Sequence, residues 1–67
     1  MISILVNGES RQIEADSTVE NLIAQLKLNS KFLAVEVNLQ VVPRAEHGRT
    51  RLAADDQVEI VTLVGGG

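Results

Sequence analysis

The sequence predicts an α+β fold in which a mixed sheet of about five strands packs on one helix. Two observations lead to this prediction. Both ends of the chain carry apolar, β-branched segments, Ile2–Val6 and Gln57–Val64, and such segments are typical of strands. Between them, only Thr18–Leu28 has its apolar residues at helical spacing. Because the two end segments are the most apolar, we expect them to be adjacent, parallel and central, with the helix covering one face of the sheet.

The composition sets the limits within which any function must lie. The chain has 67 residues, enough for one small domain, and a net charge of −3. With no cysteine and one histidine, His47, neither a disulfide nor a metal site is expected. A pI near 4.9 argues against nucleic acid as a partner. The sequence also lacks a secretory signal and a run of about 20 apolar residues, so we expect a soluble, cytoplasmic protein without a membrane partner.

The first half of the chain is expected to form a hairpin followed by the helix. Asn7–Gly8 is the strongest signal for a two-residue type I′ turn, and it joins the first strand to a polar edge strand, Glu9–Glu14. The helix presents one apolar face and begins with a capping box formed by Ser17 and Glu20. Asn29–Ser30 is expected to end it.

The second half of the chain is expected to supply the remaining strands. Leu33–Val37 forms a strand, the turn Asn38–Gln40 follows, and Val41–Val42 forms a short strand that ends at Pro43. Arg44–Arg51 is polar and irregular.

Residues 44–56 contain three features that need an interpretation. His47 lies alone in the polar loop, so we interpret it as solvated. Leu52 is the apolar anchor of this segment. Asp55–Asp56 is interpreted as a turn rather than as a catalytic carboxylate pair.

The glycine run Gly65–Gly67 is the most informative feature of the sequence. Glycine tracts are flexible and have no side chains, so such a tail is able to thread a narrow channel into the active site of another protein. The reactive group at its tip would be the carboxylate of Gly67, which needs activation, for instance as an acyl-adenylate, before it accepts a nucleophile. The alternative is that these glycines are a frayed end or a linker.

The last strand also predicts a surface for a partner. If Val58 and Ile60 pack under the helix, Val61 and Leu63 face solvent because strand side chains alternate. Leu5 from the first strand joins them, and Val64 continues the apolar surface toward the tail. We expect these residues to dock a partner. Ordinary burial on both faces of the sheet is the alternative.

Four segments carry a resemblance to a known family. They are Ile4–Gly8, Val19-x-x-Leu22-Ile23, the pair Val35–Asn38 and Val41–Arg44, and Asp56–Gly67. Together they resemble the ThiS-type sulfur carriers of thiamine biosynthesis, which belong to the ubiquitin-like β-grasp superfamily.

The resemblance covers essentially the whole chain. It implies a β-grasp domain at residues 1–64 and a flexible glycine tail at 65–67. Asp55 stands where the family has glycine, so it must adopt a positive φ, which aspartate tolerates. A third glycine in the tail is the other departure from the family pattern.

The resemblance also implies a mechanism. A ThiF-type adenylating enzyme uses ATP to form an acyl-adenylate at Gly67, while Gly65 and Gly66 thread into its site. A sulfur donor, such as a cysteine desulfurase, then produces a thiocarboxylate, and thiazole synthase accepts the sulfur. The chain itself binds no cofactor and is not an enzyme, since no nucleophile–base pair is visible.

Three alternatives remain open at this point. The chain is a sulfur carrier for another pathway, such as the small subunit of molybdopterin synthase or a tRNA thiolation system. It is a protein modifier whose carboxyl end forms isopeptide bonds. Or it is a non-covalent β-grasp interaction module with an inert tail. Chains of the molybdopterin synthase type usually run longer than this one.

Overall fold

The computed structural model describes residues 1–63. The order of elements is β-β-α-β-β-β, as predicted. The strands are β1 (Ile2–Val6), β2 (Glu9–Ile13), β3 (Leu33–Val37), β4 (Gln40–Val42) and β5 (Gln57–Thr62), the helix is α1 (Val19–Gln25), and two short 3-10 turns are η1 (Ser30–Phe32) and η2 (Arg44–Glu46). The predicted end of the last strand, Val64, lies outside the described residues.

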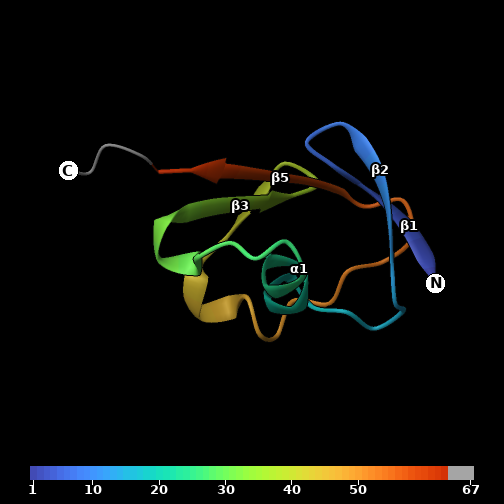
Figure 1. The fold of residues 1–67 in the computed structure, drawn as a ribbon, viewed down its shortest axis with the longest axis horizontal. Helices are drawn as coiled ribbons and strands as arrows, with labels where there is room; N and C mark the ends of the chain where they lie inside the picture. The colour runs from blue at the N-terminus through green and yellow to red at the C-terminus, as the bar shows by residue number, and fades with distance from the viewer. Residues whose placement is uncertain (64–67) are drawn as a thin grey trace.

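The sheet has five strands in the order β2-β1-β5-β3-β4. β1 and β5 lie side by side and parallel, with Leu5 opposite Gln57 and Val6 opposite Val58, while the other neighbouring strands are antiparallel. α1 covers one face of this sheet (Figure 1). The α+β class, the mixed sheet and the central parallel pair are therefore confirmed.

Both hairpins turn on two residues with positive φ. Asn7 and Gly8 have φ of 51° and 83°, and Asn38 and Leu39 have φ of 52° and 70°. The first turn confirms the Asn-Gly prediction. The second differs from the predicted three-residue turn, because Gln40 already pairs with Val37 and belongs to β4.

The helix begins one residue later than the predicted capping box. Thr18 is the N-cap: its Oγ1 accepts from the backbone N–H of Asn21, and Asn21 Oδ1 accepts from the N–H of Thr18. The prediction of Ser17 and Glu20 was wrong because Ser17 is held in the preceding turn, where its Oγ donates to the carbonyl of Glu14. The capping box is thus formed by an asparagine in place of the usual glutamate.

The helix is also shorter than predicted. Its C-cap is Leu26, and Lys27 adopts a φ of 59°, which ends the right-handed backbone. Asn29, which we expected to end the helix, instead begins η1 by accepting a hydrogen bond from Lys31 N–H.

The loop that follows η2 supports the start of this short helix. The N–H groups of Val19 and Glu20 donate to the carbonyls of Thr50 and His47 at 2.9 and 3.0 Å. Helix N-termini leave several amides without an intrahelical partner, and here the loop backbone supplies two of the missing acceptors.

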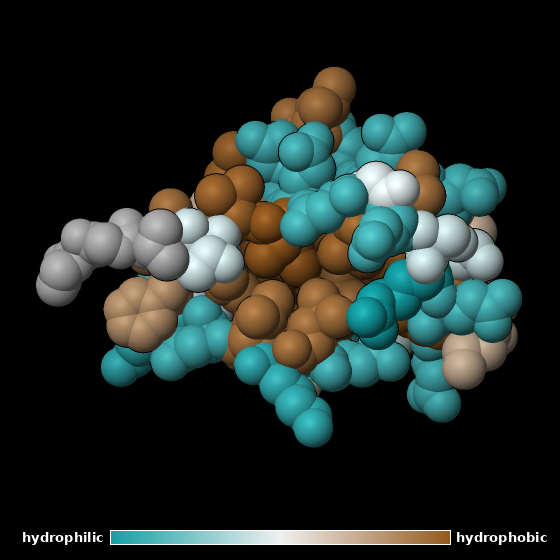
Figure 2. Space-filling view, turned by 45° about the horizontal axis from the view of Figure 1, so that its top comes forward, coloured by the Kyte–Doolittle hydropathy of each residue, from teal (hydrophilic) through white to brown (hydrophobic). Residues whose placement is uncertain are grey.

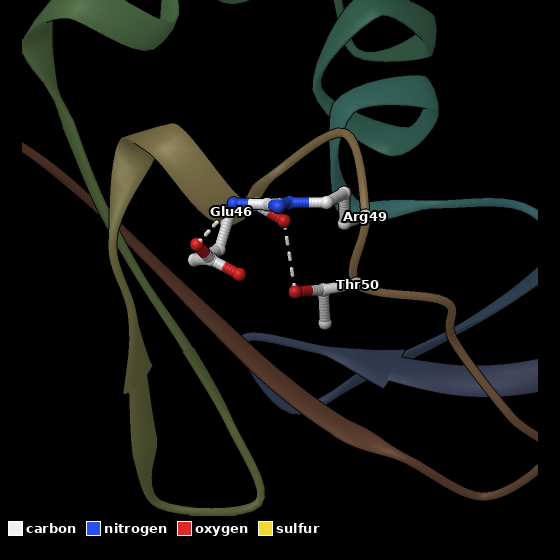
Figure 3. A network of polar contacts seen from close by, with 3 residues as sticks. All are labelled: Glu46, Arg49 and Thr50. Atoms are coloured by element: carbon white, nitrogen blue, oxygen red, sulfur yellow. Dashed lines mark hydrogen bonds and ion pairs between the residues drawn. The ribbon is translucent and has the colours of Figure 1, made fainter.

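The same loop is internally braced. Arg49 pairs with the Glu46 carboxylate at 2.6 Å, and Thr50 Oγ1 donates to the Glu46 carbonyl at 2.9 Å (Figure 3). The prediction of a solvated His47 was wrong, because only 4% of this residue is exposed. Its Nε2 lies 3.1 Å from the carbonyl oxygen of Val42, so the loop folds over the sheet instead of extending into solvent.

The hydrophobic core lies between the sheet and α1. The buried apolar residues are Ile4, Ile13, Val19, Leu22, Ile23, Leu33, Val35, Val42, Leu52, Val58 and Ile60. Leu52 is thus the anchor that the sequence predicted. Every strand contributes, and β5 supplies two of the members.

The contrast between the two hairpin turns is open to measurement. Leu39 is 81% exposed and has a φ of 70°, so Leu39→Gly removes a strained conformation without losing packing. We expect this variant to raise the free energy of unfolding by about 1 kcal/mol in denaturant titration. Gly8→Leu is the matched reverse change and should lower the free energy of unfolding, because leucine is strained at the φ of 83°. A Cβ at Gly8 meets nothing within 4 Å, so a steric clash does not contribute. Equal stability of Leu39→Gly and the wild type would contradict this account.

Candidate partner-docking site

The side chains of β5 alternate between the two faces of the sheet. Val58 and Ile60 point into the core, while Glu59 and Val61 lie on the sheet face that points away from α1, here called the outer sheet face. Leu5 belongs to the same face because it pairs with Gln57.

The predicted docking residues within the described chain reach solvent. Leu5 is 37% exposed, Val61 56% and Leu63 54%, so two-sided burial of these side chains is excluded. Val64 and the tail Gly65–Gly67 lie outside the described residues. That the exposed side chains dock a partner stays a prediction.

A shallow groove of about 510 Å³ runs along this part of the outer sheet face. Its lining comes from Leu5, the turn Asn7–Gly8 and residues 57–61 of β5. A second hollow of about 340 Å³ lies on the helix side, between α1, Arg44 and His47, and includes no residue of β5. In the space-filling view, apolar side chains gather in the middle of the face shown, surrounded by polar ones (Figure 2).

Asn7 fixes β5 at the point where β1 ends. Its side-chain Oδ1 accepts from Ile60 N–H at 2.8 Å, and its Nδ2 donates to the Ile60 carbonyl at 3.1 Å. Its backbone N–H donates to the Val58 carbonyl at 2.9 Å. The amide side chain therefore continues the β1–β5 pairing beyond the last residue of β1. Sequence reasoning saw only a turn residue, because its partner lies 53 positions away.

Asn38 fixes the first residue of β5, Gln57. Its Oδ1 accepts from Gln57 N–H at 2.9 Å, and its backbone N–H donates to the Gln57 carbonyl at 2.7 Å. Its Nδ2 donates to Asp56 Oδ1, while Asp56 Oδ2 accepts from Ala53 N–H. Asp55 has a φ of 70°, so the interpretation of Asp55–Asp56 as a turn is confirmed.

The structure adds two exposed apolar residues that the sequence analysis did not select. Val41, 68% exposed, lies opposite Glu36 on the edge of the sheet. Phe32, 55% exposed, accepts a hydrogen bond from Leu63 N–H at its carbonyl. The exposure of Val41 could have been predicted, because Pro43 indicates an edge strand and the side chains of a strand alternate between its two faces. Nothing comparable pointed to Phe32, because η1 was not predicted.

Within residues 1–63, no three acidic or histidine side chains come together as they would around a metal ion. Over the same residues, no helix is long and apolar enough to cross a membrane.

Comparison with known proteins decides the family. The family model described as the ThiS family matches residues 4–67. The chain belongs to the ThiS family. The sulfur carrier protein ThiS of Bacillus subtilis is 32% identical over 63 residues, which cover 92% of this chain and 96% of that protein.

Two further comparisons extend this result. The crystal structure of the thiamine biosynthesis protein ThiS from Geobacter metallireducens superposes with a TM-score of 0.85 at 28% identity, covering 98% of this chain and all of that one. The β-grasp fold is thereby confirmed. A thiazole synthase of Paramagnetospirillum magneticum is 38% identical over 66 residues, but the chain spans only 20% of that protein's length.

The role of Asn7 is testable with a change that keeps the turn. Asn7→Gly tolerates the φ of 51° but removes both hydrogen bonds to Ile60. We expect the free energy of unfolding to fall by about 1–2 kcal/mol and the amide of Ile60 to exchange faster with solvent. Leu39→Gly, in the other turn, is the control for the added glycine and should leave Ile60 protected. Unchanged exchange of the Ile60 amide in Asn7→Gly would contradict the role assigned to the Asn7 side chain.

Proposed function

We propose that this chain is the sulfur carrier in formation of the thiazole ring of thiamine. The observation that carries the proposal is membership of the ThiS family along nearly the whole chain, up to Gly67. Its relative in Bacillus subtilis is named as a sulfur carrier protein. The fold supports the proposal because β5, held by asparagine side chains at Gln57 and Ile60, precedes the segment of the sequence that carries Gly65–Gly67.

In this proposal, all of the atoms of the chain that react belong to Gly67. A carboxylate oxygen of Gly67 attacks the α-phosphorus of ATP, and pyrophosphate leaves. The terminal sulfur of a persulfide on the donor then attacks the acyl carbon, and AMP leaves. A second thiol reduces the S–S bond that remains, which releases the thiocarboxylate and leaves a disulfide between that thiol and the donor. The chain has no cysteine, so the sulfur does not travel on a side chain. In this scheme the ThiF-type enzyme holds ATP, and the chain acts as its co-substrate without a bound cofactor.

The second partner in this proposal is thiazole synthase. A ThiS-like segment occurs within a protein named thiazole synthase, and fusion of two segments in one chain supports their association. The sulfur donor, a cysteine desulfurase or an equivalent source, completes the set of partners. We expect these reactions to take place in the cytoplasm, where ATP is available.

The outer sheet face is proposed to contact the adenylating enzyme. Exposed apolar residues at Leu5, Val61 and Leu63 lie along β5 and its neighbour β1, with Leu63 directly before Val64 in the sequence, and partner interfaces have apolar centres with polar rims. Docking there would hold β5 in a fixed position while Val64 and the glycines reach the active site. In a mostly extended form, Val64–Gly67 would reach about 13 Å.

Intact-mass measurement tests the sulfur-carrier function. The chain is incubated with ATP, a ThiF-type enzyme and a sulfur donor, and we expect a mass gain equal to the replacement of one oxygen by one sulfur. A variant lacking Gly65–Gly67 should show no gain, because no glycine carboxylate is then left to enter the active site. A chain that gains no sulfur, or that gains it equally without the three glycines, would overturn the proposal. Attachment to lysines of other proteins would favour the modifier alternative instead.

The docking role of the outer sheet face has its own test. Val61→Asp places a charge in the proposed apolar contact, and we expect the rate of adenylation at limiting enzyme to fall about tenfold or more. Leu28→Asp is the control, since Leu28 is also exposed, at 40%, but lines the hollow on the helix side. Circular dichroism checks that both variants fold. Equal adenylation of the two folded variants would exclude docking at Val61.

A further inference from the structure

Two carboxylates of the outer sheet face lie directly opposite each other. Glu36 on β3 pairs in register with Glu59 on β5, and the side chains of such cross-strand neighbours lie on the same face. Glu36 is half-buried, with Val41 on its other side, and Glu59 is exposed. Like charges directly opposite one another destabilise a sheet, so this pair costs the isolated chain stability.

No cation of the described chain compensates the pair. Strands β1, β3, β4 and β5 contain no lysine or arginine. Arg11 on β2 lies opposite Ile4, whose side chain is buried on the helix side, so it has the wrong orientation. Within residues 1–63 the one ion pair is Arg49–Glu46, in the loop after η2. The outer sheet face is therefore apolar and acidic, and its charge is unbalanced.

The surroundings of the pair favour one kind of cation. The carboxylates lie among Val41, Val61 and the groove next to Leu5, where docking would remove water. Arginine suits such a place better than lysine, because its guanidinium is planar, is weakly hydrated and has five donors that can serve two carboxylates at once. A metal ion is disfavoured because no third acidic or histidine ligand joins the pair within the described chain.

We propose that the outer sheet face docks on a protein surface in which an arginine, surrounded by apolar side chains, inserts its guanidinium between Glu36 and Glu59. This inference rests on the proposed function, and the adenylating enzyme is the partner to which it is assigned. Apolar contacts at Val61 and Leu5 supply the buried area. The carboxylate pair supplies the orientation, because only one placement of the partner brings its guanidinium between the two strands.

The test compares two charge-matched double variants of the full chain. Glu36→Gln/Glu59→Gln removes the pair, whereas Glu9→Gln/Glu14→Gln removes two charges from β2 and the residue after it. Binding to the adenylating enzyme is measured by calorimetry at several salt concentrations. We expect the first variant to bind about tenfold or more weakly, with a flatter salt dependence, and the second to match the wild type. Glu59→Arg should bind more weakly still.

Thermal unfolding separates docking from a structural role. Removal of the like-charge pair should leave Tm unchanged or raise it, while the affinity for the adenylating enzyme falls. A lower Tm for Glu36→Gln/Glu59→Gln would assign the pair to the fold and overturn the inference, as would binding equal to that of the β2 control. If a chelator abolished binding of the wild-type chain, a metal ion and not a guanidinium would bridge the two carboxylates, and the inference would be overturned.

The two levels of proposal fail in different ways. If the wild-type chain acquires sulfur but the two double variants bind equally well, only the guanidinium contact is wrong. If the wild-type chain acquires no sulfur, the proposed function and the assigned partner both fail.

Discussion

The two hydrogen bonds between the Asn7 side chain and the backbone of Ile60 are the constraint on which the working end of the molecule depends. β1 ends at Val6, yet β5 continues to Thr62, so part of β5 would have no neighbour on that side. A side-chain amide, which carries both N–H donors and a carbonyl acceptor, takes the place of the missing peptide group. Since an unpaired strand edge invites pairing with other chains, the asparagine both aligns β5 and protects it.

The side chains of β5 alternate between a buried apolar face and an exposed face, and the hydrogen bonds to Asn7 keep this alternation in place. Val58 and Ile60 hold the core against α1, and Glu59 and Val61 remain available to a partner. The core and the proposed docking surface therefore share one backbone. The short helix needs similar support: the loop carbonyls of His47 and Thr50 complete its first turn, which offsets the weak intrinsic stability of so few helical residues.

Local sequence signals predicted the parts of this structure that local physics determines. Apolar alternation, helical spacing and the Asn-Gly pair gave the element order, the parallel centre and the exposure of Val61. The errors arose where distant contacts decide the outcome. His47 lies in a polar segment, but the loop packs over the sheet and buries it. Ser17 matched a capping box, but its hydroxyl bonds to Glu14, and Thr18 takes its place. The pairing of Glu36 with Glu59 depends on strand register, which no single segment of sequence reveals.

The parallel arrangement of β1 and β5 has a practical consequence for experiments. Val6 is level with Val58, so four steps back along β1 and four steps forward along β5 separate Ile2 from Thr62 by about 26 Å at roughly 3.3 Å per residue. A fluorophore or an affinity handle attached ahead of Met1 would therefore sit at the far end of the molecule from Leu63. Such a label can report on binding of a partner near Leu63 without blocking it sterically.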